Sequence, residues 1–173
     1  IRGVWPTGLS VPDMLMQLRD PQGRETALRR QLDVYAACEW INQNVQEHAR
    51  VVLYDETRGF YLDRLYMWGN ALHSSYIPYD TMRNGADLAA WMLAHGVRYA
   101  LINLNWSPQR WSDPELPAGP AGNEQRALER WYYEGEPKEH FRVLIRDALR
   151  KGLWVPVFAQ NGVVVLEIRQ SGE

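Results

Sequence analysis

Two neighbouring carboxylates, Asp55 and Glu56, are the first candidates for chemistry in this sequence. They follow the compact apolar run "RVVLY", which predicts a buried strand, and sites in α/β sheets commonly lie at the carboxyl ends of strands. Two carboxylates can divide acid and base roles between them. Successive strand side chains point to opposite faces, however, so the favoured interpretation is a polar strand end with Arg58 and Arg64 as ion partners.

A second group of candidates combines amides with aromatic rings. The run "LINLNW" ends a predicted strand with Asn103, Asn105 and Trp106, whose amides could bind a sugar hydroxyl and whose indole could stack on a sugar ring. A plain turn with its aromatic ring tucked back is the alternative. A possible aromatic platform combines Trp106 with Tyr66, Trp68 and Trp111, and Tyr61 is a further candidate for ligand binding.

Motifs of the common cofactor and metal enzymes are absent from the sequence. It contains no glycine-rich dinucleotide or phosphate loop, no GxSxG and no HExxH. The four histidines lack ligand spacing, and Cys38, the single cysteine, lies among apolar helical positions as a buried thiol would. The sequence therefore predicts no metal and no cofactor. A free-standing α/β enzyme that uses Asp55, Glu56 or His73 is the weakest hypothesis, because no nucleophile–base pair can be identified.

The composition is that of a folded domain with few extremes. Apolar residues make up 46% of the 173 residues and charged residues 23%, which fits one domain with its own core. The net charge of −2 and the lack of a basic stripe argue against nucleic acid as a partner. No apolar run reaches the roughly 20 residues needed to cross a bilayer. Because the chain opens on Ile1, we expect it to be a piece of a longer protein or a processed one.

Apolar periodicity outlines the helices and strands that must position these residues. Steps of three and four predict one amphipathic helix of about six turns from Arg24 to Val45. A helix capped by Asn84 and ended by Gly96 leads into a strand, so residues 50–105 predict a strand–helix–strand crossover with parallel strands. A further strand, or a pair of strands, is expected after Gly59. The remaining predicted helices are 13–19, 124–133 and 138–151.

The C-terminal part predicts a hairpin, because Asn161-Gly162 between two β-rich runs suits a type I′ turn. Pro156 lacks an amide donor, so its strand should lie at an edge or a bulge. Segment 1–22 is expected to be an extended lead-in, and 106–122 a long Pro- and Gly-rich loop. The predicted fold is a single α/β domain over 1–173, a layered sandwich with a mixed sheet.

Three groups of residues carry a family resemblance: "WIN" at 40–42 with "ARVV" at 49–52, "RGFYLDR" at 58–64, and "LAHGVRYAL" at 93–101. On these motifs the chain resembles the C-terminal region of polytopic bacterial membrane glycosyltransferases. These are similar to the dolichyl-phosphate-mannose protein mannosyltransferase and aminoarabinose transferase superfamily. The resemblance runs from the long helix to the hairpin.

The resemblance implies an extracytoplasmic domain, periplasmic or on the outer face of the inner membrane, attached to a parent with many membrane helices. Family members transfer a sugar from a polyprenyl-phosphate carrier, and we expect their catalytic acid, in an early loop, to lie outside this chain. The domain is then an accessory one, not catalytic alone, whose partners are the membrane-embedded part of its parent and a glycan or lipid-linked sugar. The segment 55–70 would form a structural rim beside the path of that sugar. The alternative is a non-catalytic module that binds carbohydrate or a cell-envelope partner.

Overall fold

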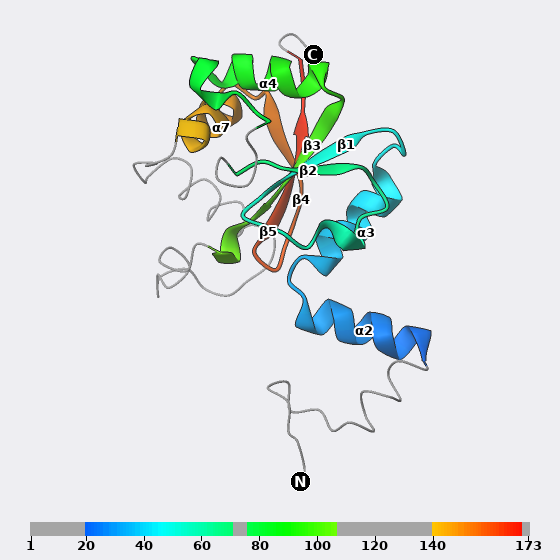
Figure 1. Cartoon of the computed structure of the whole chain (residues 1–173). Helices are drawn as coiled ribbons and strands as arrows, with labels where there is room; N and C mark the ends of the chain where they lie inside the picture. The colour runs from blue at the N-terminus through cyan, green and yellow to red at the C-terminus, as the bar shows by residue number, and fades with distance from the viewer. Residues whose placement is uncertain (1–19, 71–75, 107–139, 171–173) are drawn as a thin grey trace, which may run out of the picture.

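A five-stranded mixed sheet lies at the centre of the computed structural model, which describes residues 20–70, 76–106 and 140–170 (Figure 1). The strands are β1 (Arg50–Tyr54), β2 (Tyr66–Trp68), β3 (Val97–Asn103), β4 (Trp154–Gln160) and β5 (Val163–Ile168). The helices are α2 (Pro21–Gln31), α3 (Tyr35–Asn44), α4 (Gly85–Ala94) and α7 (His140–Arg150). Short 3-10 turns are η1 (Gly59–Tyr61), η2 (Tyr79–Thr81) and η3 (Leu104–Trp106).

The strand order is β2-β1-β3-β5-β4, with β2, β1 and β3 parallel and the remaining pairs antiparallel. This confirms the predicted α/β fold with a mixed sheet, a parallel crossover through α4 and a C-terminal hairpin. Asn161 and Gly162 have φ of 53° and 76° at the hairpin turn, as a type I′ turn requires. Pro156 lies in the edge strand β4 beside an irregularity in the register, which confirms both predicted locations.

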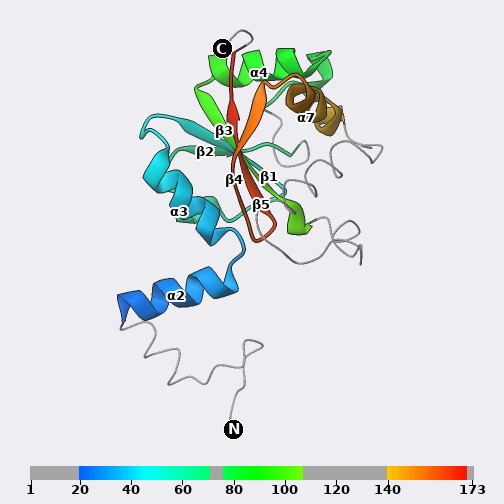
Figure 2. The same ribbon diagram turned by 180° about the vertical axis from the view of Figure 1, so that it is seen from behind.

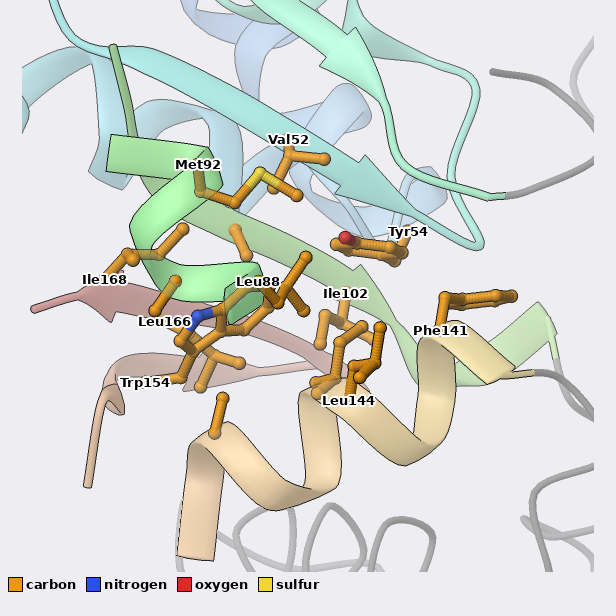
Figure 3. Packing of buried hydrophobic residues seen from close by; sticks show 14 of the residues in the cluster. Val52, Tyr54, Leu88, Met92, Ile102, Phe141, Leu144, Trp154, Leu166 and Ile168 are labelled. Atoms are coloured by element: carbon orange, nitrogen blue, oxygen red, sulfur yellow. The ribbon is translucent and has the colours of Figure 1, made fainter. Parts of the chain in front are cut away.

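Helices cover both faces of the sheet, α4 and α7 on one side and α3 on the other (Figures 1 and 2). The α4/α7 face is apolar and close-packed. Figure 3 shows Val52 and Tyr54 of β1, Leu88 and Met92 of α4, and Trp154 of β4 meeting in this core. The backbones of the two helices approach closely here: a Cβ at position 85 would overlap the backbone of α7 at position 148.

The α3 face buries a smaller apolar group. Ile41 of α3 packs over Val51 and Leu53 of β1, and the ring of Trp40 lies 5.7 Å from that of Phe158 on β4. α2 has no buried residue and projects away from the sheet (Figure 1). None of the described helices is long and apolar enough to span a membrane.

The predicted six-turn helix from Arg24 to Val45 is wrong, because the chain leaves the helical path at 32–34 between α2 and α3. Asp33 lies at this break, and its carboxylate accepts a hydrogen bond from the Val34 amide. An aspartate competes for backbone donors in this way and favours a helix start over a helix interior. After Gly59 only the three residues of β2 form a strand, preceded by η1.

The other helices follow the predictions where the structure describes them. The Asn84 side chain accepts from the amides of Ala86 and Asp87, which confirms the predicted cap of α4. α7 occupies most of the predicted segment 138–151. The predicted helices at 13–19 and 124–133 lie outside the described residues, as do most of the lead-in 1–22 and all of the loop 106–122 except Trp106.

Candidate functional site

The carboxyl ends of β1 and β3 carry a polar cluster, called here the carboxyl-edge cluster: Asp33, Glu56, Arg58, Asn103 and Asn105. The Glu56 side chain at its centre is fully buried. Its Oε1 accepts from the amides of Thr57 and Arg58 and from Arg58 Nε, at 2.8–2.9 Å. Its Oε2 accepts from an Arg58 terminal nitrogen at 2.6 Å and from Asn103 Nδ2 at 2.7 Å. Both carboxylate oxygens are therefore saturated with donors.

Asp33 completes the cluster from the break between α2 and α3. Its Oδ1 accepts from Arg58 at 2.7 Å, and its Oδ2 accepts from the amides of Asn103 and Asn105 at 3.1 and 2.8 Å. Asn105 also donates to the carbonyl of Asn161 in the hairpin turn, at 2.8 Å. The cluster thus joins four separate stretches of chain at one edge of the sheet.

The hydrogen bonds within this cluster stabilise the ionised forms of its two carboxyl groups. Burial alone would raise the pKa of Glu56, but hydrogen bonds from Arg58 and Asn103 outweigh it and lower that pKa. Asp33 behaves alike: burial opposes ionisation, yet donors from Asn105, Asn103 and Arg58 lower its pKa. The hydrogen bonds that Arg58 donates to Glu56 raise the pKa of Arg58 in turn. A carboxylate held in this way is a poor proton carrier near neutral pH, so the cluster suits positioning better than acid–base catalysis.

Asp55 faces the other side of the sheet from Glu56. Its φ of 51° is left-handed, an uncommon conformation outside glycine that aspartate tolerates better than most residues. Its amide donates to Asn70 Oδ1, and its Oδ1 accepts from Asn70 Nδ2, both at 2.7 Å. Arg142 of α7 approaches the carboxylate at 3.0 Å. Asp55 and Glu56 do not converge, so a shared acid–base pair is ruled out, as strand alternation indicated.

Arg64 and Tyr61 belong to a third group, which ties η1 to α3. Arg64 donates to the carbonyls of Asn42 and Val45 at the C-terminus of α3, where a cation also suits the helix dipole. Asn42 reciprocates, because its side chain bonds the Tyr61 carbonyl and the Asp63 amide. The Tyr61 ring packs edge-on to Tyr35 at 5.4 Å. These contacts give Arg64 and Tyr61 a structural role.

The aromatic candidates do not form one flat platform. Tyr66 and Trp68 are 38% and 44% exposed on β2, but their rings, 6.5 Å apart, are inclined by 65°. A single sugar face cannot stack on both. Trp106 ends η3 beside the carboxyl-edge cluster, whereas Trp111 and His73 lie outside the described residues.

Sequence reasoning missed three members of these groups: Asp33, Asn70 and Arg142. Asp33 carried a usable signal, since an aspartate between Leu32 and Val34 interrupts an otherwise favourable helix. Asn70 and Arg142 carried none, because only the tertiary fold brings α7 to the end of β1.

A groove in the described part of the chain lies at the other ends of the strands, opposite the carboxyl-edge cluster. This groove of about 450 Å³ runs along the alanine-rich side of α4 and ends at Arg98 and Arg169, far from the predicted residues. Among the described residues, no group of three or more His, Cys, Asp or Glu could hold a metal ion. Burial raises the pKa of the Cys38 thiol to about 12, as expected of an inert thiol.

The chain matches no protein-family model and no curated protein.

Proposed function

We propose that this chain is the extracytoplasmic C-terminal accessory domain of a membrane glycosyltransferase that uses a polyprenyl-phosphate-linked sugar. The domain holds a shaped edge beside the membrane-embedded active site of its parent and does not transfer the sugar itself. Its partners are the parent's membrane region and the lipid-linked sugar or acceptor glycan.

One observation supports this proposal: two of the three motifs behind the family resemblance, "WIN" and "RGFYLDR", contact each other. The Asn42 side chain, from the "WIN" motif, hydrogen-bonds the backbone of Tyr61 and Asp63 in "RGFYLDR". Arg64 of that second motif donates in return to the backbone carbonyls of Asn42 and Val45. Arg58 of the second motif anchors Glu56 and Asp33. Two motifs that are separated in sequence thus meet in one local structure, as a shared domain architecture would require.

The saturated carboxylates support the accessory role. Glu56 and Asp33 spend their oxygens on internal donors, and Asp55 is held by Asn70 and Arg142. An arrangement of this kind fixes loops in place and leaves the proton transfer to another part of the protein.

The test begins with the coding region upstream of Ile1, where we expect several membrane spans and an acidic residue in the first external loop. Transfer from a polyprenyl-phosphate sugar is then measured in membranes that contain the full-length parent. Arg58→Met should lower transfer at least several-fold, whereas Arg98→Met, at the opposite end of the strands, should leave it unchanged. The 173-residue chain alone should show no transfer.

Two results would overturn the proposal. An upstream region without membrane spans would remove the parent, and sugar transfer by the isolated chain would remove the accessory role. Binding of a glycan array by an isolated chain without such a parent would favour the carbohydrate-binding module instead.

A further inference from the structure

We propose that the free edge of β2 is a self-association surface, on which two copies of the chain pair antiparallel and join their sheets. This inference rests on backbone geometry and does not depend on the proposed function. The β2 edge surface consists of the two exposed aromatic residues of β2 and two exposed apolar neighbours: Phe60, Leu65, Tyr66 and Trp68.

The backbone of β2 has a paired side and an unpaired side. The Val51 amide donates to the Leu65 carbonyl at 2.9 Å, and the Gly69 amide donates to the Leu53 carbonyl at 2.7 Å. Because strand residues alternate in direction, the N–H and C=O of Met67 also face β1, while those of Tyr66 and Trp68 point outward. No other described strand pairs with β2.

This edge is complementary to itself. A twofold axis beside Met67 would place Tyr66 opposite the partner's Trp68, and Trp68 opposite the partner's Tyr66. Each pair exchanges two N–H···O bonds, so that all four outward donors and acceptors are satisfied. Because Tyr66 and Trp68 share one face of the strand, their rings would meet as cross-strand aromatic pairs. The interface is isologous and closes at a dimer.

The edge strand on the other side of the sheet, β4, is protected against pairing with a further strand. β4 carries Pro156 and an irregular register between Pro156 and Phe158, both of which oppose pairing with a further strand. β2 is only three residues long, which limits pairing, but it has no proline, no lysine and no register shift. Beside it, Phe60 and Leu65 are 69% and 63% exposed, which extends the apolar area that a second copy would cover.

Sedimentation velocity of the 173-residue chain over a hundredfold concentration range tests the proposal. Wild type should shift from monomer to dimer. Trp68→Lys places a charge on the edge and should weaken the dimer at least tenfold. The matched control is Val143→Lys, since Val143 is 43% exposed on α7 and away from β2; it should dimerise as wild type does.

Amide hydrogen exchange of the wild-type chain tests the proposal without any variant, so the proposal can still be tested if Trp68→Lys fails to fold. In the wild-type chain, the amides of Tyr66 and Trp68 should become more protected as concentration rises, while the Phe158 amide should not change. A chain that stays monomeric throughout would overturn the proposal. A dimer in which the Tyr66 and Trp68 amides exchange at the same rate at every concentration would overturn it too.

Discussion

The two faces of the sheet are held in different ways. The α4/α7 face relies chiefly on a large apolar core and on a close approach of two helix backbones, with Asp147 of α7 accepting from the Gly85 amide. The α3 face adds to a smaller apolar core a larger set of charged and amide side chains that reach across to other elements. Asp55 and Glu56 mark the boundary. They are adjacent in sequence, yet Asp55 binds Arg142 of α7 and Glu56 binds Asn103 and Arg58.

This difference indicates which face of the sheet can hold loops at fixed positions. Apolar packing tolerates little change of shape, so the α4/α7 face suits the role of scaffold. Hydrogen-bonded groups with defined directions fix loops at set positions, and the α3 face carries them at the carboxyl edge of the sheet. We therefore expect disruption of the α4/α7 face to lower stability alone, and disruption of the α3 face to alter the edge as well.

The largest effect should follow Glu56→Gln. The Glu56 carboxylate accepts five hydrogen bonds, and the NH2 group of a glutamine would face some of these donors with a donor of its own. Arg58 would also lose its buried, charged partner. We expect a loss of about 3 kcal/mol in the free energy of unfolding, measured by urea denaturation. Glu47→Gln, at an exposed glutamate, is the control and should lie close to wild type. A loss below about 1 kcal/mol would show that the cluster is less buried than described.

Gly85→Ala tests the opposite face. The new methyl group would overlap the backbone of Ala148, and we expect a loss of about 2 kcal/mol because neither helix can yield easily. Gly96→Ala is the comparison that involves backbone strain without a steric clash. Gly96 has a φ of 75° and open space around it, so the expected loss of about 1 kcal/mol in the free energy of unfolding comes from backbone strain alone. If both variants lost the same free energy, close helix packing would not explain Gly85.

Local patterns in the sequence were enough to predict the fold class, the α4 cap and the hairpin. Asn84 and the pair Asn161-Gly162 act through their own backbone neighbours, so their signals are readable without the rest of the chain. The break at Asp33 was missed because the apolar spacing continues through it at Leu32 and Tyr35. The aspartate was the local signal for the break, and the contacts of Asp33 with Arg58 and Asn105 that accompany it are tertiary.

The candidate site was predicted in part for the same reason. Glu56, Arg58 and Asn105 were singled out and lie together, because strand ends of a parallel sheet share one edge. Asp33, the partner that Arg58 and Asn105 share, comes from a distant part of the chain, so no local pattern could predict these contacts.

Acid should weaken the α3 face through Glu56 and Asp33. The pKa values of Glu56 and Asp33 are lowered in the folded protein, so their contribution is complete above the unfolded values near pH 4. It is lost as the pH falls through the folded values. The melting temperature of wild type should therefore fall more steeply below about pH 4 than that of Glu56→Gln. Parallel curves for the two proteins would contradict this assignment.

The smallest effect should follow Arg64→Met. The methionine keeps the length of the side chain but removes the donors to the carbonyls of Asn42 and Val45, and with them a cation at the end of α3. We expect a loss of about 1 kcal/mol in the free energy of unfolding. Arg98→Met, on the exposed start of β3, is the control. If the two faces are held independently, the loss should be confined to the α3 face. Amide hydrogen exchange should accelerate at Leu62 and Asp63, whose acceptors lie in η1 and α3. It should remain unchanged at Leu88 in α4. Acceleration spread evenly over both faces would mean that the sheet transmits the change and that its two sides are not held independently.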